Sequence, residues 1–455
     1  MGRVLASAGV GLLLLLSSAA CSNSGENAGN AGSSGSGGSS GNAGSSGSAG
    51  SGCGECPGGR GGTGGSAGTG GSAGVDGGGG TAGSGAFPPN PRLTDLGDET
   101  ALDLGQFECT AVPGEDPSEC RRTTDYSGFV YDPHHHVMLA FGGGHSTTMT
   151  DSIHVLDLAG SLKWTDLYPP TACDAMIAQN LDAENGAWLR GASGPFPRPV
   201  STHVYDMLAV APKLDEFLVI ARTFSGGYCN PVGNDIGGKV AHFDRVANSW
   251  SFSPSADGAT YDLATNIPGS DPDPVSGKIV LIGGGGLALY DPSTRVYSQV
   301  IDTANGGAFK NASGAETDVS SVGYANHVVY YPPDDKFYLF GHGSPIEVYA
   351  LSLNRADPEA STLARVTAQG SEPPSGEVGY DYDAVNQVIG GAVTDSTFYA
   401  FDPRTATWTS HAMKGETPGS VAFHALAYDP VDNVFVFVTD GNSGAHTWAY
   451  RLKRK

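Results

Sequence analysis

Basic residues are scarce in this chain. Of its 455 residues, 24 are Lys or Arg and 47 are Asp or Glu, so the formal net charge is −23. A surface with this balance repels the phosphates of nucleic acids and the headgroups of anionic lipids. The composition therefore excludes nucleic acid as an expected partner and favours, weakly, calcium or other cationic ligands.

Several signatures of common enzyme classes are missing as well. No nucleophile elbow, phosphate-binding loop or His-Glu-x-x-His zinc motif occurs. The apolar run near the start of the chain, Val10 to Leu16, is too short to span a bilayer. Function therefore has to be sought in the arrangement of residues in the fold.

The first 20 residues have the features of an export signal. Arg3 supplies a positive charge, an apolar run follows, and small residues lead to Cys21. Small residues directly before a cysteine resemble the lipobox of bacterial lipoproteins, although a plain secretory signal stays open. The resemblance implies cleavage before Cys21 and attachment of lipid to its thiol. Ser22 after the cysteine would favour the outer membrane or cell surface.

Residues 21–89 consist almost entirely of Gly, Ser, Ala, Thr and Asn. Such a segment has nothing to bury and is expected to be a disordered tether, with an end-to-end distance of roughly 45 Å. Cys53 and Cys56 interrupt it as Cys-Gly-Glu-Cys, for which a small local disulfide is favoured over a redox pair or half of a zinc site.

Residues 90–455 repeat one pattern six times. In the first copy, Tyr131-Asp132-Pro133 precedes an apolar run that ends in glycines at residues 142–144. Proline presets φ and aspartate caps its own backbone, so this pattern predicts a strand, a tight turn and a second strand. The other copies centre on residues 211–220, 273–284, 331–342, 382–391 and 428–438.

A third strand follows each copy, and an aromatic residue marks a fourth: Trp164, Trp250, Tyr297 and Trp408. Six sets of four antiparallel strands predict an all-β propeller. A total of seven blades remains an alternative, because the insertions 168–200 and 301–322 could contain further strands. The chain ends after the third strand of its last blade, so we expect residues 92–96, which match 163–167, to supply the missing strand and close the ring.

The Gly-Gly pair after strand two, the aromatic on strand three and the tryptophan on strand four resemble kelch repeats, as in the central domain of galactose oxidase. The resemblance covers residues 90–455 and implies the fold. It does not imply a function, because propellers serve as binding modules and as enzymes.

Cysteines of the exported part are expected to form disulfides. Beyond the pair in the tether they are Cys109, Cys120, Cys173 and Cys229. Cys109 and Cys120 lie in one loop-like segment and are expected to pair with each other. Pairing of Cys173 with Cys229 across the insertions of the first two blades is a hypothesis, because sequence alone does not give connectivity.

Blade topology places the start of strand one and the end of strand two on the same rim. We expect His145, His203, Tyr205 and Arg222 there as catalytic candidates. The remaining ligand-binding candidates of this rim are Tyr126, Asn326, His327, His342, Glu377, His424 and Asp440. Packing within a blade is the competing interpretation of the histidines, and a divalent metal at this rim stays open. His134, His135 and His136 fall in a turn at the other rim, where we expect a solvated turn.

Three functions compete. A tethered propeller could bind a carbohydrate or protein on the rim of its central channel. We expect such a protein to be a monomer. A polysaccharide lyase would use His145 or His203 as base, Tyr205 as acid and Arg222 as partner of a uronate carboxylate. A copper radical oxidase like galactose oxidase is favoured least, because its site draws on a separate C-terminal domain and on a cysteine crosslinked to tyrosine.

Overall fold

The computed structural model describes residues 87–454, except for 115–126, 144–149, 221–238, 254–268, 320–326, 342, 344, 375–377, 395, 416–417 and 440–444. The chain divides into two compact units, residues 1–74 and 75–455, and all described residues belong to the second. Within this part, no helix has the length and apolar character needed to cross a membrane. The signal, the lipidation candidate Cys21 and almost all of the tether lie outside the described residues.

The described part is all-β, with mainly antiparallel sheets. Their strands follow one another in chain order, apart from an N-terminal strand in the last sheet and a short parallel strand in the fifth. The first three sheets contain β2 (Phe129–Asp132), β3 (Val137–Ala140), β4 (His154–Asp157), β5 (Trp164–Asp166); β9 (Leu208–Val210), β10 (Glu216–Val219), β11 (Ala241–Asp244), β12 (Ser249–Phe252); and β13 (Gly269–Pro272), β14 (Ile279–Gly283), β15 (Gly286–Asp291), β16 (Val296–Asp302).

The next three sheets contain β17 (His327–Tyr331), β18 (Lys336–Phe340), β19 (Val348–Ser352), β20 (Thr362–Val366); β22 (Tyr380–Asp383), β23 (Val388–Thr394), β24 (Thr397–Asp402), β25 (Thr407–Ala412); and β26 (Val421–Asp429), β27 (Val434–Thr439), β28 (His446–Arg451) with β1 (Thr100–Gln106). A short strand, β21 (Gln369–Gly370), adds to the fifth sheet in parallel with β25.

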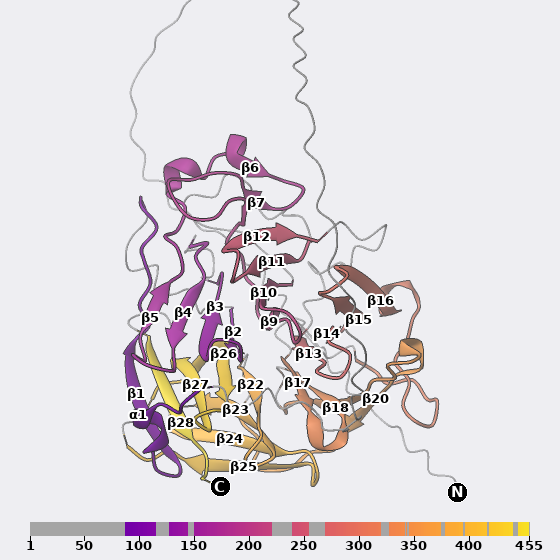
Figure 1. Ribbon diagram of the computed structural model, residues 1–455. Helices are drawn as coiled ribbons and strands as arrows, with labels where there is room; N and C mark the ends of the chain where they lie inside the picture. The colour runs from indigo at the N-terminus through magenta and orange to yellow at the C-terminus, as the bar shows by residue number, and fades with distance from the viewer. Residues whose placement is uncertain are drawn as a thin grey trace, which may run out of the picture. The chain divides into compact units, whose positions relative to one another are not determined.

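The first strands of the six sheets contact one another in a cycle. β2 contacts β9 and β26, β13 contacts β9 and β17, and β22 contacts β17 and β26. Figure 1 shows these inner strands gathered in the middle, with strands such as β5, β16, β20 and β25 at the periphery. This arrangement is consistent with a propeller-like fold.

The tight turns form as predicted, both at three Asp-Pro pairs and at Asp383, which is followed by Ala384. One carboxylate oxygen accepts the backbone N–H two residues ahead, at 2.8–3.1 Å, from Asp132 to His134, Asp273 to Val275, Asp383 to Val385 and Asp429 to Val431. Each of these turns ends on a residue with positive φ: His136, Gly277, Gln387 and Asn433. The local sequence therefore fixes the turn, and with it the register of strands one and two.

An N-terminal strand completes the sixth sheet, but it is not the predicted one. β1 pairs with β28 from Thr100 opposite Arg451 to Gln106 opposite His446. The expected strand at residues 92–96 instead begins with the short helix α1 (Pro91–Thr94). Pro91 suits the first position of a helix, and the Asn90 side chain accepts the Arg92 N–H at 3.1 Å, so this segment caps a helix instead of extending.

The core lies between the sheets. The fourth-strand tryptophans Trp164, Trp250 and Trp408 are all buried, as their spacing in the repeats predicts. The insertion 168–200 forms a separate three-stranded sheet of β6 (Leu181–Asp182), β7 (Ala187–Trp188) and β8 (Arg198–Pro199). It packs Trp188 against Met176 and Val200, and the described residues of both insertions form no additional four-stranded sheet.

Candidate functional site

Only part of the predicted rim can be placed. Seven of the candidates lie outside the described residues: His145, Arg222, Tyr126, Asn326, His342, Glu377 and Asp440. His424 falls within β26, but its side chain is outside the description as well. The catalytic set of the lyase hypothesis is therefore represented by His203 and Tyr205, and the ligand-binding set by His327.

His203 and Tyr205 precede β9, the first strand of the second sheet. Their rings meet edge to face with centroids 5.9 Å apart, and both side chains are buried. Tyr205 has φ of 46°, which is unusual for an aromatic residue, and its carbonyl oxygen accepts the N–H of Gly128 from the first sheet at 3.0 Å. Strain of this kind is stored where surrounding structure holds the backbone, and it is frequent at functional sites.

The next residue, Asp206, connects three sheets. Its Oδ1 lies 2.8 Å from His327 Nδ1 in the fourth sheet. Its Oδ2 accepts the backbone N–H of Val328 at 2.9 Å and that of Ser270, in the third sheet, at 3.1 Å. The structure therefore brings His327 to the same end of the inner strands as His203 and Tyr205. Asp206, which directly follows Tyr205 in the chain, makes this connection.

Glycine makes this close approach feasible. A Cβ on Gly269 would lie 2.7 Å from Val328 Cγ2 and 2.9 Å from Asp206 Oδ2. Any larger residue at this position would push the carboxylate of Asp206 away from the backbone of β17. The absence of a side chain at Gly269 thus leaves room for the Asp206 carboxylate to reach the backbone of β17.

Two more carboxylates lie on inner strands. Asp271 of β13 accepts the Tyr330 N–H at 2.5 Å, and Asp381 of β22 accepts the N–H groups of Tyr382 and Tyr428 at 2.6 and 2.7 Å. Both are partly exposed although they stand on the innermost strands of their sheets. Like Asp206, they join one sheet to the next through backbone hydrogen bonds.

These three carboxyl groups share one electrostatic environment. Burial, together with the nearby charges of Asp381 and Asp206, raises the pKa of Asp271 well above its usual range. Burial also raises the pKa of Asp381 to about 6, and that of Asp206, although His327 counteracts the second shift. All three pKa values are thus shifted in the same direction, because burial disfavours the charged form of each carboxyl group.

None of these three aspartates was predicted from the sequence. A signal was present, because Asp271 and Asp381 stand in first strands, where the repeat places residues near the axis. A carboxylate in such a strand needs hydrogen-bond donors from neighbouring strands or from a ligand. Asp206 could not be identified in this way, because it comes before β9 and its partners belong to other sheets.

At the opposite end of the strands, the three histidines do not form the solvated turn that was expected. His134 is exposed and His135 half-buried, but His136 is completely buried between Asp429 and Asp432, because the turn packs against the sixth sheet. Two groups with the composition of metal ligands result.

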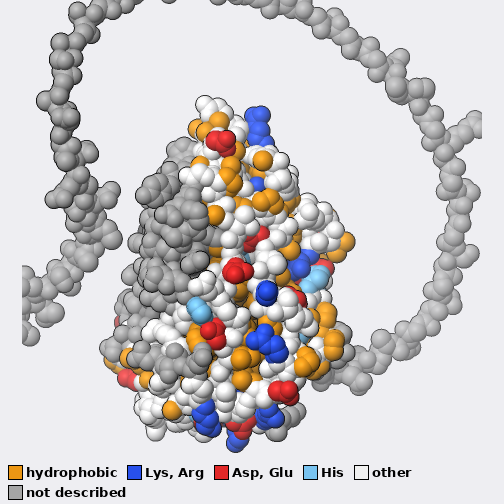
Figure 2. Space-filling model, turned by 90° about the vertical axis from the view of Figure 1, so that its left-hand side faces the viewer, with side chains coloured by type: hydrophobic (Ala, Val, Ile, Leu, Met, Phe, Trp, Pro, Cys, Tyr) orange, Lys and Arg blue, Asp and Glu red, His pale blue; other side chains and the backbone are white. Residues whose placement is uncertain are grey.

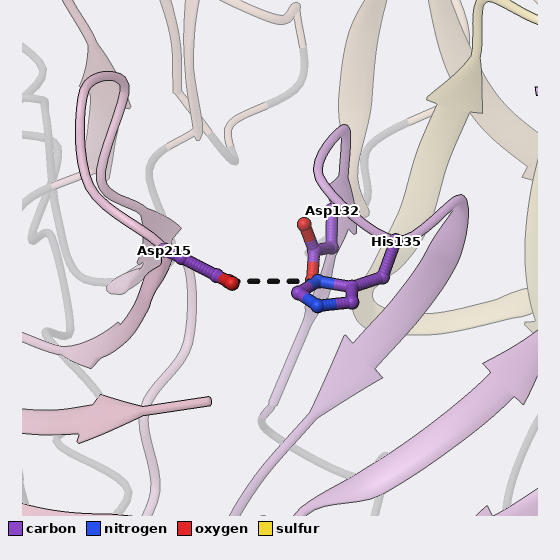
Figure 3. Close-up of side chains that lie close together, drawn as sticks. All are labelled: Asp132, His135 and Asp215. Carbon is purple, nitrogen blue, oxygen red and sulfur yellow. Dashed lines mark hydrogen bonds and ion pairs between the residues drawn. The ribbon is translucent and has the colours of Figure 1, made fainter. Parts of the chain in front are cut away.

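The first group, Asp132, His135 and Asp215, is drawn in Figure 3, where Asp215 points from the second sheet toward the His135 ring. His135 Nδ1 lies 3.0 Å from Asp132 Oδ2 and 3.5 Å from Asp215 Oδ1. Arg245 Nη1 is already 2.8 Å from the same Asp132 Oδ2. A guanidinium at that oxygen opposes a metal cation, so this group is an ion-pair network between the first two sheets.

Cys109 and Cys173 are both disulfide-bonded. The other four candidates, Cys53, Cys56, Cys120 and Cys229, lie outside the described residues, so the predicted pairing stays a prediction. Within the insertion, Trp188 and Arg198 are buried, and Arg198 pairs with Asp151 at 3.1 Å. Packing, one of the two roles considered for the aromatic and arginine residues of this loop, accounts for both.

The space-filling view in Figure 2 shows acidic and basic side chains interspersed among neutral and apolar ones, and the described residues of this face form no continuous basic patch.

Comparisons with known proteins identify no family. No family model matches the chain, and no curated protein matches it. Among solved structures, a protein of unknown function from Bacteroides thetaiotaomicron superposes with a TM-score of 0.41 and 10% identity, over 77% of this chain and 75% of that one. An auxiliary nutrient binding protein from the same organism superposes with a TM-score of 0.44 and 9% identity, over 76% of each chain.

Proposed function

We propose that residues 90–455 form a closed propeller of six kelch-like blades that binds a carbohydrate or protein ligand at one end of its central channel. The cyclic contacts among β2, β9, β13, β17, β22 and β26 support six blades, and the pairing of β1 with β28 supports closure. The fourth-strand tryptophans and the glycines after strand two support the kelch-like assignment.

One observation carries the proposed binding site: the Asp206–His327 pair and the His203–Tyr205 pair lie where first strands begin, and the carboxyl groups of Asp271 and Asp381 stand on two of the inner strands, β13 and β22. Imidazole, phenol and partly exposed carboxyl groups are the hydrogen-bonding groups that recognise sugar hydroxyls. The three carboxyl groups of Asp206, Asp271 and Asp381 favour a neutral or cationic ligand over an anionic one.

A polysaccharide lyase is the second candidate, because the ring contact between His203 and Tyr205 joins the predicted base and acid. A uronate substrate would, however, bring its own carboxylate toward Asp206, Asp271 and Asp381, which disfavours binding unless a cation intervenes. Binding of a neutral or cationic ligand therefore ranks first.

The propeller is proposed to be a lipid-anchored protein of the outer membrane or cell surface, held by Cys21 and a tether of residues 21–89. Support comes from the apolar run that ends in small residues before Cys21 and from the composition of the tether. In this arrangement the tether would keep the ligand site away from the membrane and give it access to large extracellular ligands.

A glycan array probed with the full-length chain, extracted in detergent, tests the proposal. We expect binding to neutral or amino sugars, a loss of about tenfold or more in Asp271→Asn, and unchanged binding in Asp244→Asn, which alters a carboxylate outside the inner strands. Release of unsaturated uronate products, measured by ultraviolet absorbance, would favour the lyase. Absence of any glycan or protein ligand, or equal binding by both variants, would contradict the proposed site.

A further inference from the structure

The second group of metal-ligand type, His136, Asp429 and Asp432, lies between the first and the last sheet. His136 belongs to the turn between β2 and β3, Asp429 is the last residue of β26, and Asp432 lies in the turn between β26 and β27. All three side chains are 0% exposed. The group therefore sits where the chain's first and last described blade-like sheets meet.

The donor atoms converge on one point. His136 Nε2 lies 3.1 Å from Asp429 Oδ2 and 3.4 Å from Asp432 Oδ2. Bonds of about 2.1 Å in a tetrahedral site place neighbouring ligand atoms about 3.4 Å apart. The two distances from Nε2 are thus close to this spacing, and ligand atoms of all three residues lie within 4.8 Å of one another.

The remaining contacts orient the two carboxylates. Asp429 Oδ1 accepts the backbone N–H of Val431 at 2.9 Å and of Asp432 at 3.4 Å. Asp432 Oδ1 accepts the N–H of Asn90 at 2.8 Å. Each carboxylate therefore uses one oxygen for the backbone and turns the other toward His136. Asp432 Oδ2 is buried and accepts no hydrogen bond, so it is aimed into the group without a donor of its own.

Charge balance points the same way. Among the described residues, His136 is the one ion-pair partner of Asp429 and Asp432. The guanidinium of Arg451 lies nearby, but it donates to backbone carbonyl oxygens, including that of Asp432 at 2.6 Å. The buried group has two carboxyl groups for one imidazole, and each charge without a counter-charge is costly away from water. A divalent cation with a neutral imidazole would bring the group to neutrality.

We propose that His136, Asp429 and Asp432 bind one divalent transition-metal cation, Zn²⁺ in preference to Ca²⁺, as a structural clamp between the first and last sheets. The single imidazole and two carboxylate oxygens suit Zn²⁺, whereas Ca²⁺ takes six to eight oxygen ligands. The N-terminal segment covers the site, because Asn90 binds Asp432 and the Phe87 ring lies 5.6 Å from that of His136. The metal would therefore tie together three parts of the chain that are far apart in sequence.

The test measures metal content and metal-dependent stability of the full-length chain purified without chelators. We expect one equivalent of zinc per chain, a fall in Tm of several degrees after chelation, and recovery with Zn²⁺ but not with Ca²⁺. His136→Gln and Asp432→Asn should lower zinc affinity on the order of tenfold or more. Asp215→Asn is the matched control, since it changes an aspartate of the other His-Asp group and should leave zinc binding unchanged.

If either ligand variant fails to fold, Co²⁺ in the wild-type chain decides the question. A tetrahedral site of nitrogen and oxygen ligands gives intense visible absorption, and six-coordinate Co²⁺ gives weak bands. Strong absorption retained in Asp215→Asn supports the proposal. It is overturned if the wild-type chain binds no metal, in which case the group holds protons, if zinc binding is lost in Asp215→Asn, or if Co²⁺ shows six-coordinate bands.

Discussion

Asp206 and His327 form an ion pair of 2.8 Å between the second and the fourth sheet, across the edge of the sheet that lies between them. The same carboxylate also accepts backbone N–H groups of Ser270 and Val328. One side chain therefore fixes three consecutive sheets relative to each other at the end where His203 and Tyr205 lie. Any ligand site at this end depends on that carboxylate.

Removal of this carboxylate should destabilise the protein. Asp206→Ala leaves two backbone N–H groups and His327 without their acceptor, and we expect a loss of about 3 kcal/mol or more in the free energy of unfolding. Denaturant unfolding measures the change, and Asp244→Ala serves as a control at an aspartate that caps its own turn by accepting the N–H of Ala247. Equal stability of the two variants would show that Asp206 does not connect the sheets.

Gly269 should tolerate no side chain. Gly269→Ala places a methyl group 2.7 Å from Val328 and 2.9 Å from Asp206, so we expect a loss of about 1–3 kcal/mol, as for other overpacked positions. Gly341→Ala is the matched control, because its nearest neighbour would be 3.7 Å away. Thermal unfolding compares the two, and a Gly269 variant as stable as the Gly341 variant would contradict the close packing described here.

The carboxyl group of Asp381 should make stability depend on pH. Its pKa rises from an ordinary value to about 6 in the folded chain because of burial, so folding takes up a proton between these values. The contribution of this group is fully favourable below the unfolded pKa, near 4, and is lost as pH rises through about 6. A pKa shift of this size corresponds to about 3 kcal/mol in the free energy of unfolding. We reduce this contribution to about 2 kcal/mol because Asp381 is partly exposed.

Asp381→Asn tests this dependence. Relative to wild type, the variant should gain about 2 kcal/mol between pH 4 and pH 7, since asparagine does not ionise. Denaturant unfolding at both pH values gives this difference, and any fixed cost of the substitution cancels in it. A difference that stays constant with pH would mean that the folded pKa of Asp381 is ordinary.

The N-terminal strand should be required for folding, whereas the tether should not. Removal of residues 1–86 should leave the melting temperature unchanged. Removal of residues 1–106 takes away α1 and β1, exposes the edge of β28 and leaves Arg451 without the carbonyl oxygens of Leu93, Thr94 and Leu96, so unfolding is expected. Equal melting temperatures of the two truncated chains would contradict this role.

Anchoring can be tested apart from the fold. Cys21→Ser removes the thiol to which lipid would be attached, so the protein should move from the membrane fraction to the soluble fraction. Cell fractionation and mass spectrometry of the N-terminus provide the measurement, and Cys53→Ser is a control within the tether. A Cys21→Ser protein that stays in the membrane and is cleaved at the same position would contradict the lipoprotein interpretation.

The sequence by itself determined the repeating strands and the turns between them. Asp-Pro pairs, short apolar runs and fourth-strand tryptophans are local patterns, and the turn-capping carboxylates of Asp132, Asp273, Asp383 and Asp429 lie where local geometry requires them. The same local rules account for α1, since Asn90 and Pro91 specify a helix start where matching with residues 163–167 had suggested a strand.

Only the tertiary structure decided which side chains meet. Asp206 and His327 are 121 positions apart in the chain, and His136 and Asp429 are 293 positions apart. Contacts of this kind depend on which sheets become neighbours, and no short-range pattern encodes that. A turn of three histidines therefore suggested exposure, whereas packing of the last sheet against the first buried one of them between two carboxylates.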